Sequence, residues 1–241
     1  SEGAIEQFLR QARQIIDLLH PNIVDVYDCA EDRGVAFMAE EYINSPTLRD
    51  LINETPGKAL PFDVALSIAE SVTRGLEYAH AHGVIHGDLK PKNVLLADHV
   101  KISDFGLGRL ESGRPLINID VPLTLATAQY LAPEQVLGHP IDARTDLYVL
   151  GIILYEIFTG QPPFEGTDQE VLEFHRTGSP VPPRQFNPRL SRSLEHLILK
   201  LLDKDPNKRY ASARKVRHIL NSMAIATGGQ VQPRTFMTEP W

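Results

Sequence analysis

Apolar side chains recur every three or four positions along much of the chain, which is the spacing of one face of an α-helix. This spacing is clear in residues 4–19, 62–79, 194–202 and 216–223, and it predicts a helix with one buried stripe in each. The first two stripes consist of Ile5, Phe8, Leu9, Ala12, Ile15, Ile16 and Leu19, and of Ala65, Ile68, Ala69, Val72, Leu76 and Ala79. Residues 146–158, DLYVLGIILYEIF, are apolar on nearly every side. They predict a buried central helix, because a surface helix would keep one polar face.

Short apolar runs bounded by polar turns predict two pairs of β-strands. The first pair is IVDVYDC and VAFMAEEYI, residues 23–29 and 35–43, joined by the polar turn EDRG. The second pair is VLLA and VKIS, parted by a turn at residues 98–99. Thr167 is followed three residues later by Glu170, which is the capping-box spacing that begins a helix.

The predicted elements divide the chain into three parts. Residues 1–43 contain one helix and two strands, a unit too small to bury a core by itself. Residues 44–226 are mainly helical and long enough for a large core. Residues 227–241 contain Gly, Pro, Thr and Gln without periodicity, so they are either a linker or a docked extension.

The composition removes several classes of protein. The chain has 241 residues and a formal net charge of -7, whereas a generic nucleic-acid-binding protein should carry a basic surface. Its single cysteine, Cys29, excludes an internal disulfide framework and a cysteine-rich zinc site. No apolar stretch approaches the ~18 residues of a membrane span, and the polar residues 1–11 are unlike a signal peptide. We therefore expect a cytoplasmic protein, with no nucleic-acid contact and no membrane contact from this fragment.

One stretch, HGVIHGDLKPKNVLLADHVKISDFG at residues 82–106, combines the groups that phosphoryl transfer needs. That reaction requires a carboxylate that accepts or orients the proton of the acceptor hydroxyl, a cation near the phosphates, and oxygen ligands for magnesium. Asp88, Lys90, Asn93 and Asp104 supply these groups in this order. Taken singly, each could be a turn, surface or cap residue, but together at this spacing they favour a catalytic site.

This stretch and three later motifs resemble the eukaryotic-type (Hanks-type) serine/threonine protein kinases, of the bacterial-like kind. HGDLKPKN resembles the catalytic loop, DFG the magnesium-binding loop, and Leu-Ala-Pro-Glu at 131–134 the end of the activation segment. Asp146 with Gly151 resembles the start of the central helix, and Arg209 resembles the partner of Glu134.

The resemblance implies an α+β, protein-kinase-like fold. Its mainly helical large lobe would be residues 44–226, and residues 1–43 would be the remnant of a truncated small lobe. It also implies structural roles for three polar residues: Asp146 and Arg209 would anchor the fold, and His86 would pack and hydrogen-bond rather than act as a base.

The resemblance further implies that the stretch transfers phosphate from ATP with the help of Mg²⁺ or Mn²⁺. Asp88 and Lys90 would be the catalytic residues. Asp88 would accept or orient the proton of the substrate hydroxyl, and Lys90 would neutralise charge on the transferred phosphoryl group. Asn93 and Asp104 would ligate the metal. A lysine at position 90 is also typical of the serine/threonine subgroup.

Further positions would line the nucleotide and substrate pockets. Leu95 would form the floor under the adenine, and the backbone of Glu41 and Ile43 would meet the edge of the adenine. Thr127 would line the pocket beside the acceptor residue of a protein substrate.

Residues 1–43 depart from the pattern of this family. No G-x-G-x-x-G loop occurs in the chain, and no lysine precedes Lys58. The glutamate that should pair with a strand lysine falls at Gln11, unless the alignment slips and Glu6 serves. Glu40 falls beside the adenine pocket, where the family has an apolar or small residue, unless the strand is offset by one residue and Glu40 points to solvent. A carboxylate in that pocket is costly to desolvate unless it is paired or protonated.

A further departure is Gly87, directly before Asp88. Many kinases of this family have an arginine there, which binds a phosphate on the activation loop and so orders that loop. Glycine cannot make this contact. Control through it should therefore be missing, although Ser112 and Thr124 are candidate phosphorylation sites.

Two functions compete on these grounds. The first is ATP- and magnesium-dependent phosphoryl transfer to serine or threonine of protein substrates, for which Asp88, Lys90, Asn93 and Asp104 are all present. The second is a pseudokinase that binds or regulates a partner protein without turnover, favoured by the departures in residues 1–43. A small-molecule kinase is disfavoured because the resemblance of the Ala-Pro-Glu segment, together with Thr127, implies a shelf for a peptide substrate. For this chain we expect weak or absent catalysis, because positioning of the phosphates supplies much of the rate.

Overall fold

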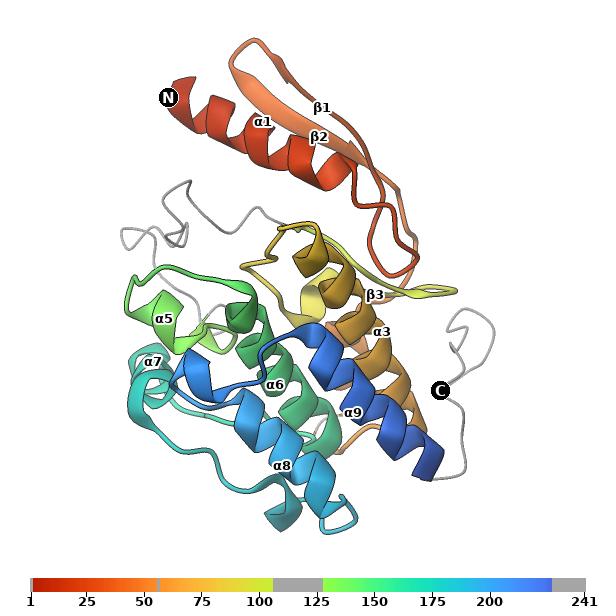
Figure 1. Ribbon diagram of the computed structural model, residues 1–241, viewed down its shortest axis with the longest axis vertical. Coiled ribbons are helices and arrows are strands. Elements are labelled where there is room, and N and C mark those ends of the chain that lie inside the picture. The colour runs from red at the N-terminus through yellow and green to blue at the C-terminus, as the bar shows by residue number, and fades with distance from the viewer. Residues whose placement is uncertain (1, 56, 106–127, 227–241) are drawn as a thin grey trace.

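The computed structural model describes residues 2–55, 57–105 and 128–226 (Figure 1). Ser112, Thr124 and Thr127 lie outside the described residues, as does the tail 227–241. The described chain forms two regions of unequal size, a small helix-and-hairpin unit at one end and a mainly helical body below it in Figure 1.

The small unit consists of α1 (Glu2–Ile16) and a hairpin of β1 (Val26–Asp32) and β2 (Val35–Glu40). The two strands are antiparallel, and α1 packs across them. The predicted polar turn is confirmed, since Arg33 and Gly34 between the strands both have positive φ, 51° and 80°.

Two local expectations for this unit are wrong. Leu19 is 67% exposed, whereas Leu18 is 1% exposed, because α1 ends at Ile16 and the following turn reverses which side faces the core. The first strand also begins later than predicted, at Val26, because Ile23 pairs elsewhere.

The segment 22–24 pairs with the large body instead of with the hairpin. Ile23 and Ile102 form a parallel bridge, in which the Val24 amide donates to Ile102 O and the Ile102 amide donates to Asn22 O, both at 3.0 Å. Asn22 Nδ2 adds a bond to Val100 O at 2.8 Å. The segment thereby extends the small sheet of β3 (Val94–Leu96) and β4 (Val100–Ile102), which are antiparallel to each other.

The large body is built on the two helices with the clearest apolar patterns. These are α3 (Phe62–Ala81) and α6 (Ala143–Thr159). Every residue of the predicted α3 stripe is buried, and α6 is buried along nearly its whole length, which confirms the prediction of a central helix. The remaining helices of the described residues are α2 (Leu48–Glu54), α5 (Pro133–Val136), α7 (Asp168–Thr177), α8 (Arg192–Leu201) and α9 (Ala213–Ala226), with short 3₁₀ turns η1 (Pro91–Asn93), η2 (Pro183–Gln185) and η3 (Pro206–Lys208).

The capping prediction for α7 is confirmed: Thr167 Oγ1 accepts from the Glu170 amide, and Glu170 Oε2 accepts from the Thr167 amide at 2.8 Å. Helix α2 was not predicted, although Thr47 and Asp50 form the same reciprocal bonds at its start. Among the described helices, none is both long and apolar enough to cross a bilayer.

Candidate active site

Asp88, Lys90 and Asn93 lie together in the loop between α3 and β3. Lys90 Nζ donates to Asp88 Oδ2 at 2.6 Å, so the cation and the carboxylate face the same space. The 3₁₀ turn η1 brings Asn93 back towards Asp88, whose carbonyl accepts from Asn93 Nδ2 at 3.1 Å. The side chain of Asp88 is 43% exposed, which leaves room for a substrate hydroxyl at its carboxylate.

Asp104 is held next to this loop through its neighbour Ser103. The Ser103 amide donates to Asn93 O at 3.0 Å, and the Ser103 carbonyl bonds His86 Nε2 at 2.9 Å. The backbone of Asp104 has φ 60°, in the left-handed region that aspartate tolerates better than most residues. The two predicted metal ligands, Asn93 and Asp104, therefore lie on adjoining segments.

His86 joins the two segments that carry Asp88 and Asp104. It is fully buried, its ring lies 4.7 Å from that of Phe105, and its Nδ1 accepts from the Asp88 amide at 3.2 Å. Burial lowers the pKa of His86, so the ring is neutral and one nitrogen can accept while the other donates. The prediction that His86 packs and hydrogen-bonds is confirmed.

The backbone of the catalytic loop is fixed to Asp146 of α6. The amides of His86 and Gly87 donate to its two carboxylate oxygens, each at 2.9 Å, and His80 Nε2 lies 2.7 Å from Oδ2. Burial opposes ionisation of Asp146, but the hydrogen bond and charge of His80 outweigh it and lower the pKa. The predicted anchoring role of Asp146 is confirmed.

Gly87 has a backbone reason to be glycine that the sequence did not suggest. Its φ is 76°, which L-residues with a side chain adopt only with strain. In that conformation its amide reaches Asp146 Oδ1, and its carbonyl accepts from Gln135 Nε2 at 2.7 Å. Glycine at this position therefore lets the loop that carries Asp88 adopt this conformation without backbone strain. This reason is separate from the predicted absence of an arginine contact.

The segment after β2 lies at the junction of the two regions. The Glu41 amide donates to Asp25 O at 2.8 Å. Of the two backbone groups of Glu41, only the carbonyl is therefore left to accept a hydrogen bond from adenine. Within the described ranges, the amide of Ile43 makes no backbone hydrogen bond. Lys101 of β4 forms an ion pair with the Glu41 carboxylate and opposes Leu95 in the β3–β4 pair. The Lys101 contact was missed, because nothing in local spacing links residues so far apart.

Glu40 is the last residue of β2. Its side chain is exposed, yet partial burial and the charge of Asp104 raise its pKa. The Glu40 side chain therefore points to solvent, as the alternative expected, although it lies close enough to Asp104 for that charge to act on it. A second carboxylate therefore lies near the predicted metal ligand.

We expect Glu40→Gln to raise the midpoint of thermal unfolding at pH 7.5 by up to about 2 °C and to leave it unchanged below the ordinary glutamate pKa of about 4.3. The sign follows because a raised folded-state pKa means that the ionised form is disfavoured in the folded protein. Calorimetry of both proteins across pH 3.5–8 measures the effect, with Glu54→Gln on the exposed side of α2 as the control. If the difference in unfolding midpoint between Glu40→Gln and the parent were the same at all pH values, the interaction of Glu40 with Asp104 would be contradicted.

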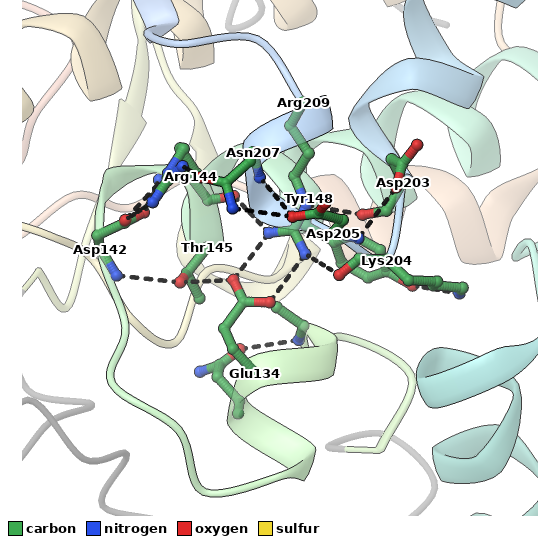
Figure 2. A network of polar contacts seen from close by, with 12 residues as sticks. Glu134, Asp142, Arg144, Thr145, Tyr148, Asp203, Lys204, Asp205, Asn207 and Arg209 are labelled. Carbon is green, nitrogen blue, oxygen red and sulfur yellow. Dashed lines mark hydrogen bonds and ion pairs between the residues drawn. The ribbon is translucent and has the colours of Figure 1, made fainter.

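Glu134 and Arg209 form the buried ion pair that the sequence predicts (Figure 2). Arg209 Nη1 and Nη2 donate to the two Glu134 oxygens at 2.7 and 2.8 Å, and Thr145 Oγ1 donates to Oε1 at 2.8 Å. The pair ties α5, which follows the activation segment, to the loop between α8 and α9.

A second polar cluster, missed from the sequence, holds Tyr130. Its hydroxyl bonds both Arg49 of α2 and Glu156 of α6, and Arg49 Nη1 donates to Glu156 Oε1 at 3.0 Å. Burial, and then the charge of Glu156, raise the pKa of Tyr130 well above its ordinary value, so the hydroxyl keeps its proton. The shelf around residues 128–134 is thus fixed at both ends.

The donors at Asn93 and Asp104 suit a hard divalent cation, because both offer oxygen atoms. Asn93 Nδ2 is engaged with Asp88, which leaves the amide oxygen Oδ1 as the ligand atom. The described residues contain no group of three or more His, Cys, Asp or Glu placed to hold a metal. A cation here would therefore need phosphate oxygens or water to complete its coordination.

Comparison with protein families matches residues 2–221 to the protein kinase domain. A probable serine/threonine-protein kinase of Clostridium perfringens is 36% identical over 219 residues, which cover 90% of this chain and 31% of that protein. Serine/threonine-protein kinase PknB of Mycobacterium tuberculosis is 37% identical over 220 residues, covering 88% and 34% respectively. The chain thus spans about a third of the length of these curated relatives.

Among solved structures, the crystal structure of a cysteine-to-alanine mutant of the Mycobacterium tuberculosis PknI kinase domain superposes with a TM-score of 0.71 at 26% identity. The match covers 92% of this chain and 79% of that one. It confirms the predicted α+β architecture, with its helical large lobe and truncated small lobe.

Proposed function

This chain belongs to the protein kinase domain family, and from that premise we propose that it transfers the terminal phosphoryl group of ATP to serine or threonine hydroxyls of protein substrates. The single observation that supports this most is the joining of Asn93 to Ser103. It places the predicted metal ligands Asn93 and Asp104 beside Asp88 and Lys90. We also propose that the protein acts in the cytoplasm.

The proposed chemistry follows from the positions of these side chains. The Asp88 carboxylate accepts a hydrogen bond from the substrate hydroxyl and takes its proton as the new phosphorus–oxygen bond forms, while the bond between the γ-phosphorus and the β–γ bridging oxygen breaks and ADP leaves. Lys90, now 2.6 Å from Asp88, moves to the transferred phosphoryl group and offsets its charge. Asn93 and Asp104 would hold Mg²⁺, which would supply positive charge to neutralise the phosphates. The Glu41 carbonyl and the Ile43 amide meet the adenine, with Leu95 beneath it.

A second candidate function, a pseudokinase that binds a partner protein, is favoured by Glu40. Its carboxylate adds negative charge beside Asp104, where the nucleotide phosphates would lie. No lysine in residues 1–43 offsets that charge, and Gln11 on α1 is uncharged. We therefore expect the 241-residue chain to transfer phosphate weakly or not at all.

The test is transfer of phosphate from labelled ATP to a basic protein substrate. It compares the 241-residue chain, any longer product that its gene encodes ahead of Ser1, and Asp104→Asn in the longer product. Activity in the longer product that Asp104→Asn abolishes would support the kinase. Equal background in all three proteins would favour the pseudokinase, and strong activity in the short chain would overturn our expectation of weak catalysis. Thermal shift with Mg²⁺ and ATP reports binding separately from turnover.

A further inference from the structure

A chain of hydrogen bonds runs from the α8–α9 loop through the core to the shelf at residues 128–134. Lys204 Nζ donates to the Tyr148 hydroxyl at 2.9 Å, and that hydroxyl lies 3.0 Å from His175 Nδ1. His175 Nε2 in turn lies 3.2 Å from the carbonyl of Gln129. Four segments that are distant in sequence are thereby joined in one line.

The direction of each bond in this line is determined. Burial, and then the charge of Lys204, lower the pKa of His175 to about 3, so its ring is neutral at physiological pH. A lysine ammonium can only donate, so the Tyr148 oxygen accepts from it and its proton points to His175 Nδ1. Nε2 must then carry the ring proton and donate it to Gln129.

The surroundings hold this line rigidly. His175 is 1% exposed, and its ring meets that of Phe164 edge-on at 5.1 Å. Lys204 Nζ lies 4.4 Å from the Phe164 ring and also donates to Phe174 O at 2.9 Å. Arg209 lies over the Tyr148 ring at 4.8 Å, which connects the line to the Glu134 ion pair (Figure 2).

The end of the line is a backbone carbonyl of the shelf. Gln129 lies between Ala128, which is completely buried, and Tyr130, whose hydroxyl is fixed by Arg49 and Glu156. Tyr130 and Gln129 are therefore held by different elements. The Tyr130 side chain bonds α2 and α6, and the Gln129 backbone bonds α7. A side chain that donated nothing at position 175 would release one of these two fixed points.

We propose that His175 is a positioning residue for the protein substrate. Through its Nε2–H bond to Gln129 it fixes the position of residues 128–134, the shelf against which the acceptor segment of the substrate lies. This inference rests on the proposed function. A single rigid ring that both accepts from Tyr148 and donates to Gln129 meets the requirement, whereas phenylalanine would leave the Tyr148 proton without its acceptor and the Gln129 carbonyl without this donor. Glutamine can present one donor and one acceptor and should restore part of the effect.

The experiment compares His175→Phe, His175→Gln and the control His99→Gln, which lies in the exposed turn between β3 and β4. In the active form of the protein we expect His175→Phe to raise the KM for the protein substrate about tenfold, as loss of one buried hydrogen bond implies. The KM for ATP should stay within about twofold, because none of the hydrogen bonds in this line involves a proposed nucleotide-binding residue. His175→Gln should lie between His175→Phe and the parent.

Amide hydrogen exchange gives a readout that needs no catalysis. We expect faster exchange in peptides covering 128–134 of His175→Phe, with exchange in α3 unchanged. Unchanged substrate KM together with unchanged exchange would overturn the proposal. Faster exchange throughout the large lobe would also overturn it, because His175 would then support only the fold. If no protein transfers phosphate, the proposed function fails but the exchange comparison still decides the role of His175.

Discussion

Arg209→Met is expected to lower the free energy of unfolding by about 3–5 kcal/mol, because it leaves the buried carboxylate of Glu134 without its partner. The Arg209 side chain is completely buried, and all five of its hydrogen bonds go to protein atoms. Besides the two bonds to Glu134, it donates to three backbone carbonyls, those of Asp203, Arg144 and Lys204. Methionine fills much of the space but can satisfy none of these acceptors.

Urea denaturation followed by circular dichroism measures this loss. The matched control is Arg192→Met, at an exposed position at the start of α8, which should change the unfolding free energy by no more than about 0.5 kcal/mol. Combining Arg209→Met with Glu134→Gln should cost less than the sum of the two single changes, since the second change removes the charge that the first left unpaired. A loss below about 1 kcal/mol for Arg209→Met would mean that water or a neighbouring cation replaces the guanidinium.

Asp88→Asn in the active form of the protein should reduce kcat by about 10²- to 10⁴-fold, the usual range for removal of a general base. Asparagine keeps the size of the side chain and can still receive the hydrogen bond from Lys90, but it cannot take a proton. The KM for ATP should change little, because we propose that Asp88 faces the acceptor hydroxyl and that the metal ligands are Asn93 and Asp104.

The control for this measurement is Asp98→Asn, which makes the same chemical change in the exposed turn beyond β3. Its kcat should equal that of the parent. If Asp88→Asn retained full activity, Asp88 could only orient the loop, and the proton would leave by another route. If both variants were equally inactive, loss of folding would be the cause, and thermal unfolding would reveal it.

The parts of the fold that the sequence predicted are those that repeat a local pattern. The helices α3 and α6 follow from the periodicity of their apolar side chains, and the cap at Thr167 follows from its distance to Glu170. Expectations failed where the pattern stops. The stripe assigned Leu19 to the core, but α1 ends at Ile16 and Leu18 turns inward.

The candidate site was predicted as far as its residues lie in one short stretch or match the family motif. The long-range contacts that hold these residues in place were not predicted. Lys101 lies 60 residues from Glu41, and His175 lies 46 residues from Gln129, and no periodicity relates positions so far apart. The φ of Gly87 was equally hidden, because glycine in a sequence is compatible with either sign of φ.

The segment 22–24 gives the two lobes a common mechanical element. It lies six residues beyond the end of α1, and the Ile23 amide donates to His20 O at 2.9 Å, yet the segment also bonds Ile102, two residues before Asp104. The backbone hydrogen bonds of this segment therefore join the small lobe to the strand that leads into Asp104.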